Sequence, residues 1–280
     1  MIVPVTTREL LHRAYVLAQR TRRELAAAGV PPGDFAGIAH HYGLTLAWAP
    51  LPAHQPGCYL AAAKRIVLNP RGQGRERLNF TFHHELMHDR IEQDEEFLSL
   101  FADATPPADE TTMERVCDAG AAELLMPGGD VQVMVQAHGF SPGTIPRLCR
   151  RYQASSIAVA LQMLGTAPHV CYLVIAAPAG GEGARGRLLP GDPRGPAAPP
   201  PLRMLYTASS PAAKYSIKRG QPVPLDHLIT AAWVQAGTVV RGQTPLPFAS
   251  GRGWRVACEA LAFRQKVFAF FHVPLGGHPG

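Results

Sequence analysis

Apolar residues recur at helical spacing through the first half of the chain, with short strand-like runs between the helical segments. Segment 6–28 has apolar positions three and four residues apart, Thr6 and Glu9 fit a capping box at its start, and Gly29 ends the pattern. A long first helix is therefore predicted there. By the same criteria we expect helices at 34–42, 74–91, 95–101 and 111–125, and two or three short ones within 130–165.

Short runs rich in β-branched and aromatic residues predict strands. In the first half these are 44–50 and 58–69, and the second run has the form of a hairpin that turns near Ala63 and Lys64. Near the C-terminus the runs at 170–178 and 267–273 indicate strands, and 225–236 indicates a helix.

The amino-acid composition of the chain changes after the region of short helices. Residues 178–201 contain 13 Pro or Gly in 24 positions, a composition that cannot form regular structure and predicts a loop. The sequence as a whole therefore predicts a multi-domain α+β protein. We place its divisions at 1–129, 130–166 and 167–280.

Composition narrows the class of protein. With 46% hydrophobic and 17% charged residues the chain is expected to be globular. It has neither a signal-peptide pattern nor an apolar run long enough for a membrane span, and its five scattered cysteines include no C-x-x-C pair. We therefore expect a cytoplasmic protein with core thiols, not disulfides. The net charge of +6 permits an acidic partner or nucleic acid but requires neither.

The chemistry concentrates in "FHHELMH", where residues 84–88 read H-E-x-x-H. On a helix His84 and His88 lie on one face, so both imidazoles can bind one Zn²⁺. Glu85 can then act as a base toward a water molecule without ligating the metal. His83 has no histidine partner one turn away. The alternative interpretation is a polar helix face with solvated histidines.

A catalytic zinc site needs a third protein ligand. A histidine extension of the motif would require Gly at 91 and His at 94, but the sequence has Ile91 and Asp94, so Asp94 is only a secondary candidate. The helix at 111–125 offers Glu114 as the third ligand, and Asp118 one turn later to accept the ring N–H of a ligand histidine. Glu123 is a further acidic candidate, for which we favour a structural role.

"RLNFTFHHELMH" and, some 25 residues later, "ERVCDAGAAELLMP" together resemble the ImmA/IrrE family of zinc metallopeptidases, most closely its IrrE branch. The resemblance is strong over about residues 55–165. It implies His84, His88 and Glu114 as metal ligands and Glu85 as the catalytic residue. Cys117, Asp118 and Gly120 depart from the usual family pattern of Ala, Asn and Phe, and the sequence offers no reason for the glycine.

The resemblance also implies an architecture and a function. It implies a zincin-like metallopeptidase domain (1–129), a helix-turn-helix unit (130–166) and a GAF-like sensor domain (167–280). The implied activity is cytoplasmic cleavage of an XRE-type helix-turn-helix repressor similar to DdrO, which would induce a DNA-damage or radiation response. Zn²⁺ is the expected cofactor, with Mn²⁺ as the alternative in the cell.

Two features of substrate handling are expected from the residues before the motif. Tyr59, on the strand that precedes the motif helix, is a weak candidate for the donor that stabilises the oxyanion of the reaction. Its more ordinary role is that of a half-buried strand tyrosine. An edge strand formed by 58–69 could bind an extended substrate segment by strand addition.

Residues 142–165 fit a helix-turn-helix, but their second helix, "SSIAVALQML", carries no charged residue. Arg147, Arg150 and Arg151 belong to the first helix instead. A DNA-reading helix normally offers Arg, Lys, Asn or Gln to the bases, so we expect a packing or partner-docking element and no direct DNA binding. For 167–280 a structural or dimerisation role, including a homodimer, is favoured over ligand sensing.

A different class of function also accommodates these features. The chain could be a DNA-binding or repressor-binding transcriptional regulator whose metal site is structural. Glu85 discriminates between the two, because a structural metal site needs no general base.

Overall fold

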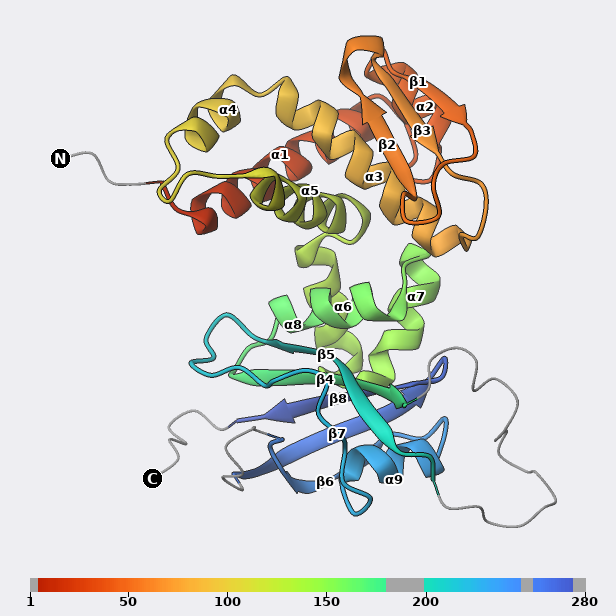
Figure 1. Ribbon diagram of the computed structural model, residues 1–280, viewed down its shortest axis with the longest axis vertical. Helices are drawn as coiled ribbons and strands as arrows, with labels where there is room; N and C mark the ends of the chain where they lie inside the picture. The colour runs from red at the N-terminus through yellow and green to blue at the C-terminus, as the bar shows by residue number, and fades with distance from the viewer. Residues whose placement is uncertain (1–4, 180–198, 248–253, 274–280) are drawn as a thin grey trace. The chain divides into compact units, whose positions relative to one another are not determined.

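The computed structural model describes residues 5–179, 199–247 and 254–273 (Figure 1). Its contacts divide the chain into two compact units, which we call the N-terminal and C-terminal units. The N-terminal unit runs to Pro127 and includes Arg151–Ser155, and the C-terminal unit comprises Gly128–Arg150 and the residues from Ser156 onward. The helices expected as a separate unit at 130–166 thus group mostly with the C-terminal sheet, and the three-part division stays a prediction.

The N-terminal unit is built mainly from helices, at the positions predicted from the sequence. The long first helix begins at its predicted cap: the Thr6 side chain accepts from the Glu9 backbone N–H, and the Glu9 carboxylate accepts from the Thr6 backbone N–H. Asp34 caps the second helix, also as predicted. The helices are α1 (Thr7–Ala27), α2 (Phe35–His41), α3 (Arg75–Glu92), α4 (Glu95–Ala102) and α5 (Glu110–Leu125).

A small sheet packs along α3 (Figure 1). Its strands are β1 (Thr45–Trp48), β2 (Gly57–Leu60) and β3 (Arg65–Leu68), in the order β1-β3-β2. The predicted hairpin is confirmed: β2 and β3 pair antiparallel, and the chain turns through a 3-10 segment (Ala61–Ala63) and Lys64. The prediction of one edge strand over 58–69 is wrong for its second half. Of the two strands in this run only β2 lies at an edge of the sheet, because β3 pairs with β1 on one side and with β2 on the other.

The core of the N-terminal unit lies where α1 and α5 pack against α3. Leu10 and Leu17 of α1, Phe82 and Leu86 of α3 and Val116 of α5 are at most 1% exposed. The motif helix therefore has one face in the core and can present its opposite face to solvent. Packing of this kind fixes the helix far more firmly than its own helix propensity does.

The C-terminal unit is a five-stranded antiparallel sheet in the order β5-β4-β8-β7-β6 (Figure 1). Helix α9 (Leu228–Val234) contributes Ile229 and Ala232 to the apolar core on one face of the sheet, and α8 (Ser156–Gly165) packs on β4 and β5. The strands are β4 (Cys171–Pro178), β5 (Leu202–Ser209), β6 (Val240–Pro245), β7 (Arg255–Phe263) and β8 (Lys266–His272). The strands predicted at 170–178 and 267–273 and the helix predicted at 225–236 are confirmed as β4, β8 and α9.

The sequence-based prediction missed β6 and β7, which form a hairpin-like pair. The β6 sequence "VRGQTP" contains Gly and Pro and has few apolar residues. The β7 sequence "RVACEALAF" consists largely of good helix formers, and its only strand signal is the alternation of buried Val256, Cys258 and Ala260. Those side chains join the core under α9, so tertiary packing overrides local propensity here.

Three short helices occupy the region predicted to contain two or three: α6 (Gly128–His138), α7 (Ile145–Tyr152) and α8. Residues 153–155 give α7 and α8 the short connection that a helix-turn-helix requires. Half of the ten residues of α8 are buried, namely Ser156, Val159, Ala160, Met163 and Leu164. This burial agrees with a packing role for the helix that was expected to lack a DNA-reading surface.

The thiols and the loop at 178–201 are the remaining features expected from the composition. All five cysteines are free, and Cys117, Cys149, Cys171 and Cys258 are buried, as expected for core thiols, while Cys58 is partly exposed. Most of the predicted loop lies outside the described residues. Among the described helices, none combines the length and the apolar character that crossing a bilayer demands.

Asp94, the secondary ligand candidate, lies at a structural junction instead. Its carboxylate accepts hydrogen bonds from Arg13 and Arg20 of α1, at 2.9 and 2.7 Å, and from the Phe97 backbone N–H at the start of α4. Burial alone would raise the pKa of Asp94, but these donors lower it below its ordinary value. With its oxygens engaged in this way, Asp94 is not available as a metal ligand in this structure.

We expect Asp94→Asn to destabilise the fold by about 2–3 kcal/mol at pH 7, because Arg13 and Arg20 lose their buried anion while the helix cap survives. The folded pKa of Asp94 is depressed, so its stabilising effect is complete above the ordinary value of 3.8 and disappears as pH falls through the folded pKa. In urea unfolding, the difference in unfolding free energy between the wild type and Asp94→Asn should be smaller at pH 3 than at pH 7. Asp103→Asn, at an exposed position, is the control, and an equal effect of the two changes would contradict the assignment.

Candidate metal centre

Helix α3 carries the H-E-x-x-H motif on its solvent-facing side. His84 and His88 lie one turn apart, and their side chains are 14% and 24% exposed. His83 points into the core instead. It is 2% exposed and its Nδ1 donates to the Asn79 carbonyl, so burial lowers its pKa to about 4 and keeps the ring neutral.

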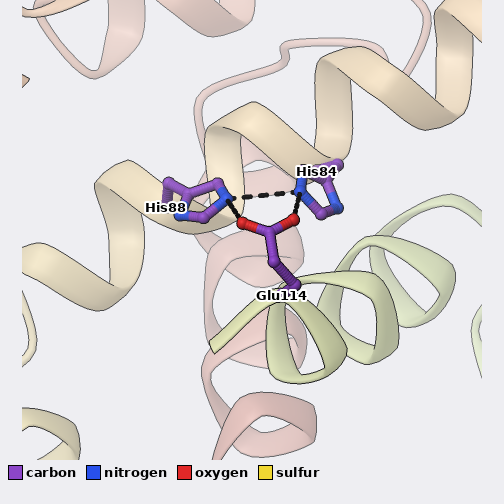
Figure 2. A group of neighbouring side chains, drawn as sticks. All are labelled: His84, His88 and Glu114. Atoms are coloured by element: carbon purple, nitrogen blue, oxygen red, sulfur yellow. Dashed lines mark hydrogen bonds and ion pairs between the residues drawn. The ribbon is translucent and has the colours of Figure 1, made fainter. Parts of the chain in front are cut away.

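Helix α5 brings Glu114 to the same point (Figure 2). One carboxylate oxygen lies 3.1 Å from His84 Nε2 and the other 3.4 Å from His88 Nε2, and the two imidazole nitrogens are 3.2 Å apart. The three donor atoms lie within 4.8 Å of one another, the one such group of three or more among the described residues. His84, His88 and Glu114, predicted from sequence, are therefore adjacent in space.

Asp118 determines which nitrogen of His84 is available. Its carboxylate lies 2.9 Å from His84 Nδ1, which must carry the hydrogen of that bond, so Nε2 presents a lone pair. This lone pair faces a carboxylate oxygen of Glu114 and the ring nitrogen of His88. With the ring neutral, the lone pairs are directed at one point, as the ligands of a metal ion would be. The role predicted for Asp118 agrees with its position.

The residues present fit a divalent metal ion. A tetrahedral Zn²⁺ with bonds of about 2.0–2.1 Å has its donor atoms about 3.3–3.4 Å apart. The separations here, 3.1–3.4 Å, match that geometry. The Glu114 side chain is 51% exposed, so the centre is open to solvent on one side, as a catalytic site requires and a closed structural site does not.

The pKa values of the two histidine ligand candidates are shifted in opposite directions. Burial lowers the pKa of His84, but the hydrogen bond to Asp118 and the charges of Glu85, Asp118 and Glu114 outweigh it, so the net shift is upward. Burial and the nearby His84 lower the pKa of His88. The carboxylates around His84 thus already stabilise one positive charge at the centre.

Glu85 lies beside the centre but is not one of the three converging groups. It is 7% exposed, and burial raises the pKa of its carboxyl to about 7. The carboxylate accepts the backbone N–H of Tyr59 in β2. A β-carbon at Gly57 would lie 2.6 Å from Thr81 Cγ2 and 3.2 Å from Glu85 Oε1, so glycine is needed for this close approach of strand and helix.

Tyr59 itself has a different role from the one expected. Its hydroxyl lies 2.9 Å from Asp89 and 2.7 Å from Glu92, and the Lys64 ammonium lies 3.1 Å from Asp89. Since the single hydroxyl proton is engaged by these carboxylates, this structure does not support Tyr59 as an oxyanion donor. Its contacts instead fasten the β2–β3 hairpin to the C-terminal half of α3.

Gly120, which the sequence could not explain, sets the distance between α3 and α5. A β-carbon at this position would lie 2.4 Å from Met87 Cε, 2.8 Å from Met87 Sδ and 3.0 Å from Met87 Cγ. Met87 is fully buried, so it has little room to move away. The Met87 side chain therefore occupies the space that any other residue at 120 would fill. The glycine allows α3 and α5 to approach closely beside the centre.

Glu123, the remaining acidic candidate, has a structural role, and so has a cluster of side chains around Asp89. Glu123 is 2% exposed and accepts from Gln19 of α1, as the preferred structural interpretation required. The cluster around Asp89 was not predicted. Its only signal in the sequence was an acidic residue directly after His88, on a face that the hydrophobic pattern assigns to the interior.

Known proteins are similar to this chain over most of its length. A family model described as the IrrE N-terminal-like domain matches residues 39–163. The radiation response metalloprotease IrrE of Deinococcus deserti is 30% identical over 273 residues, which cover 94% of this chain and 91% of the relative. The protein of the same description from Deinococcus radiodurans is 28% identical, covering 92% and 79%.

One solved structure extends the comparison to the fold. A Mycobacterium tuberculosis transcriptional regulator superposes with a TM-score of 0.60 at 16% identity, over 95% of this chain and 79% of that chain. At this identity the match shows a shared fold and nothing about activity.

The close approach at Gly120 is testable. Overpacking against Met87 should cost Gly120→Ala about 1–3 kcal/mol, and the gain in helix propensity offsets roughly 1 kcal/mol of it. We therefore expect a net destabilisation of up to about 2 kcal/mol. Gly129→Ala is the matched control, because a β-carbon there meets nothing within 4 Å. Thermal unfolding of both variants distinguishes the effects. A Gly120→Ala protein as stable as the control variant would show that Met87 yields without cost.

Proposed function

The chain belongs to the IrrE family of metallopeptidases, and from this premise we propose that it is a zinc-dependent endopeptidase that cleaves a helix-turn-helix transcriptional repressor. Cleavage would remove the repressor and induce a radiation or DNA-damage response. We propose a cytoplasmic location and an XRE-type, DdrO-like substrate, as the family resemblance implies.

One observation carries the proposal: two histidines and a glutamate from different helices converge at an open centre, with a buried carboxylate beside them. His84, His88 and Glu114 are proposed as the ligands, with Asp118 orienting His84. Two imidazoles and one carboxylate suit Zn²⁺ best, because Zn²⁺ binds such sites more tightly than Mn²⁺ does. Mn²⁺ is the alternative where its concentration in the cell is higher.

The chemistry follows from the positions of the residues. Bound Zn²⁺ would supply a nucleophilic water at neutral pH and polarise the scissile carbonyl. Glu85 accepts the proton of the attacking water and later returns it to the leaving amine, as a general base and then a general acid. The Tyr59 backbone N–H fixes one oxygen of the Glu85 carboxylate, so the orientation of this carboxylate depends on β2.

The edge strand β2 suggests how a substrate is bound. Within its sheet β2 pairs with β3 alone, so its other side has no strand partner, although the Tyr59 N–H on that side donates to Glu85. An extended peptide added there by strand pairing would run alongside the strand that contacts Glu85. This favours a flexible, extended segment of the repressor as the site of cleavage.

The remaining regions have supporting roles in the proposal. Residues 130–166 would act as a helix-turn-helix element that packs or docks a partner, consistent with the burial of half of α8. Residues 167–280 would form a GAF-like domain, a role supported by the antiparallel sheet with helices packed on it. A structural or homodimer-forming role is preferred to ligand sensing for this domain.

A transcriptional regulator with a structural metal is the second candidate. It is motivated by the basic net charge of the chain and by the short connection between α7 and α8, which a helix-turn-helix requires. Against it stand the open side of the centre and the buried Glu85, neither of which a structural metal site needs.

Metal binding tests the ligand set directly. The metal-free protein should bind one Zn²⁺ per chain, and Glu114→Ala should weaken binding strongly because one of three ligands is lost. Asp118→Asn should weaken it about 10- to 100-fold. Glu110→Ala, one turn earlier on α5 and exposed, is the control. Unchanged zinc affinity, by titration calorimetry, of the Glu114→Ala protein would exclude Glu114 as a ligand.

A cleavage assay tests the activity. The wild type with Zn²⁺ or Mn²⁺ should cut the candidate repressor at one or a few bonds, and a chelator should stop the reaction. Glu85→Gln should still bind Zn²⁺ but cut at least about 100-fold more slowly, because it cannot accept a proton. If both proteins bind the repressor with a full complement of metal and neither cuts it, the regulator is the correct function.

A further inference from the structure

The N-terminal unit contains a small pocket that none of the proposed metal ligands lines. It lies between α1, the segment that joins α1 to α2, helix α3 and the end of α5, and it is partly open to solvent. Two of its seven lining residues are polar, Arg22 and His83. A concave and mainly apolar site with few polar groups is the usual form of a small-molecule site. The apolar wall consists of Leu25, Ala26, Val30, Pro32 and Leu124.

His83 places one hydrogen-bond acceptor in this pocket. Its Nδ1 lies 2.7 Å from the Asn79 carbonyl and must donate to it, so Nε2 of the neutral ring carries a lone pair. No hydrogen bond from another described residue reaches Nε2, and yet this atom is not sealed from solvent. Because His83 is only 2% exposed, Nε2 must meet solvent where the residue lines the pocket.

The packing around His83 fixes the direction of this acceptor. Phe82 and Phe35 both make edge-to-face contacts with the imidazole ring, with centroid distances of 5.5 and 6.3 Å. The hydrogen bond to Asn79 fixes the rotation of the ring. A ligand therefore meets an acceptor that is already in place, which lowers the entropy lost on binding.

Arg22 forms the other polar part of the wall. Its Nη1 donates to the Leu124 carbonyl at 2.8 Å, which ties the guanidinium group to the end of α5. A guanidinium group held in this way can lie over the face of an aromatic ring. The pocket thus combines a fixed acceptor, a planar cation and apolar side chains.

We propose that this pocket binds a small aromatic molecule that carries a hydroxyl group, with phenol as the simplest case. The pocket has a volume of about 130 Å³, and an apolar cavity of about 150 Å³ takes up benzene, so the space suits a single ring. The hydroxyl group donates to Nε2 of His83, and the ring contacts Arg22 and the apolar wall.

Two other occupants fit the pocket less well. A carboxylate would suit Arg22, but its oxygens would oppose the lone pair of His83 without a hydrogen between them. An ordered water molecule needs about two to four polar partners, whereas most of the lining side chains are apolar. A phenol satisfies the acceptor with its single donor and covers the apolar wall with its ring.

This inference goes beyond the proposed protease activity and does not depend on it. His83 and the ligand candidate His84 are consecutive residues of α3, but His83 points into the core and His84 lies on the solvent-facing side. Binding in the pocket therefore needs neither a metal ion nor a protein substrate, and it can be measured without either.

Titration of the full chain with fluorinated probes, followed by fluorine NMR, tests the proposal. The probes are 4-fluorophenol and fluorobenzene, which carry the same reporter atom and differ only by the hydroxyl group. We expect 4-fluorophenol to bind about fivefold more tightly than fluorobenzene, because it alone gains a net hydrogen bond. His83→Leu should remove this difference and leave fluorobenzene bound, since the acceptor is lost and the apolar wall remains.

Ala26→Trp should abolish the binding of both probes, because an indole ring on this exposed lining residue fills the pocket. Ala27→Trp is the matched control. Ala27 is also exposed on α1 but does not line the pocket, so this variant should bind like the wild type. Equal affinity of the wild type for the two probes would overturn the proposal, as would binding that survives Ala26→Trp, or no binding at all. Unchanged thermal unfolding of each variant verifies that it is folded.

Discussion

The close approach of α3 and α5 is the constraint on which the candidate metal centre depends. His84 and His88 come from one helix, and Glu114 comes from another that begins 18 residues after the first one ends. Donor atoms must meet within a few tenths of an ångström for a metal to bind well. Met87 filling the space above Gly120 sets that separation, because packed cores are stiff and a single added carbon is felt. The contact of Met87 with Gly120 therefore decides whether the proposed ligands can converge.

Polar contacts fix α3 at the same time from two other directions. Toward the sheet, the buried carboxylate of Asp89 binds Tyr59 and Lys64, which fastens the hairpin to the helix. Just beyond the end of the helix, Asp94 binds two arginines of α1 and caps α4. Because Tyr59 also donates its backbone N–H to Glu85, the hairpin orients the proposed base as well. Asp89 and Asp94 are both buried, and each carboxylate would be costly without its cation.

Much of this arrangement could be predicted from the sequence, and the failures have physical reasons. Helix periodicity and capping residues located α1, α2 and α5 nearly to the residue, and the i, i+4 spacing placed His84 and His88 on one helix face. Glu114 followed from the need for a third ligand. What the sequence could not reveal were contacts between distant segments. The partners of Asp94 lie more than 70 residues away on α1, and Tyr59 looked available only because its carboxylate partners were unknown. Strand β7 was missed because its composition favours a helix and its strand conformation depends on neighbouring strands.

Lys64 shows how two requirements meet at one position. Its φ of 46° lies in the left-handed region, where glycine or asparagine would be the easier choice for the turn between β2 and β3. Yet its ammonium group is the nearest full positive charge to Asp89, 3.1 Å away, with Arg90 only at 3.4 Å. A residue better suited to the turn would leave that anion poorly compensated, and a shorter cation would not reach it. Sequence variation at this turn is therefore restricted by electrostatics and not by backbone preference. An engineer who optimised the loop by conformation alone would loosen the strand that contacts Glu85, the proposed base.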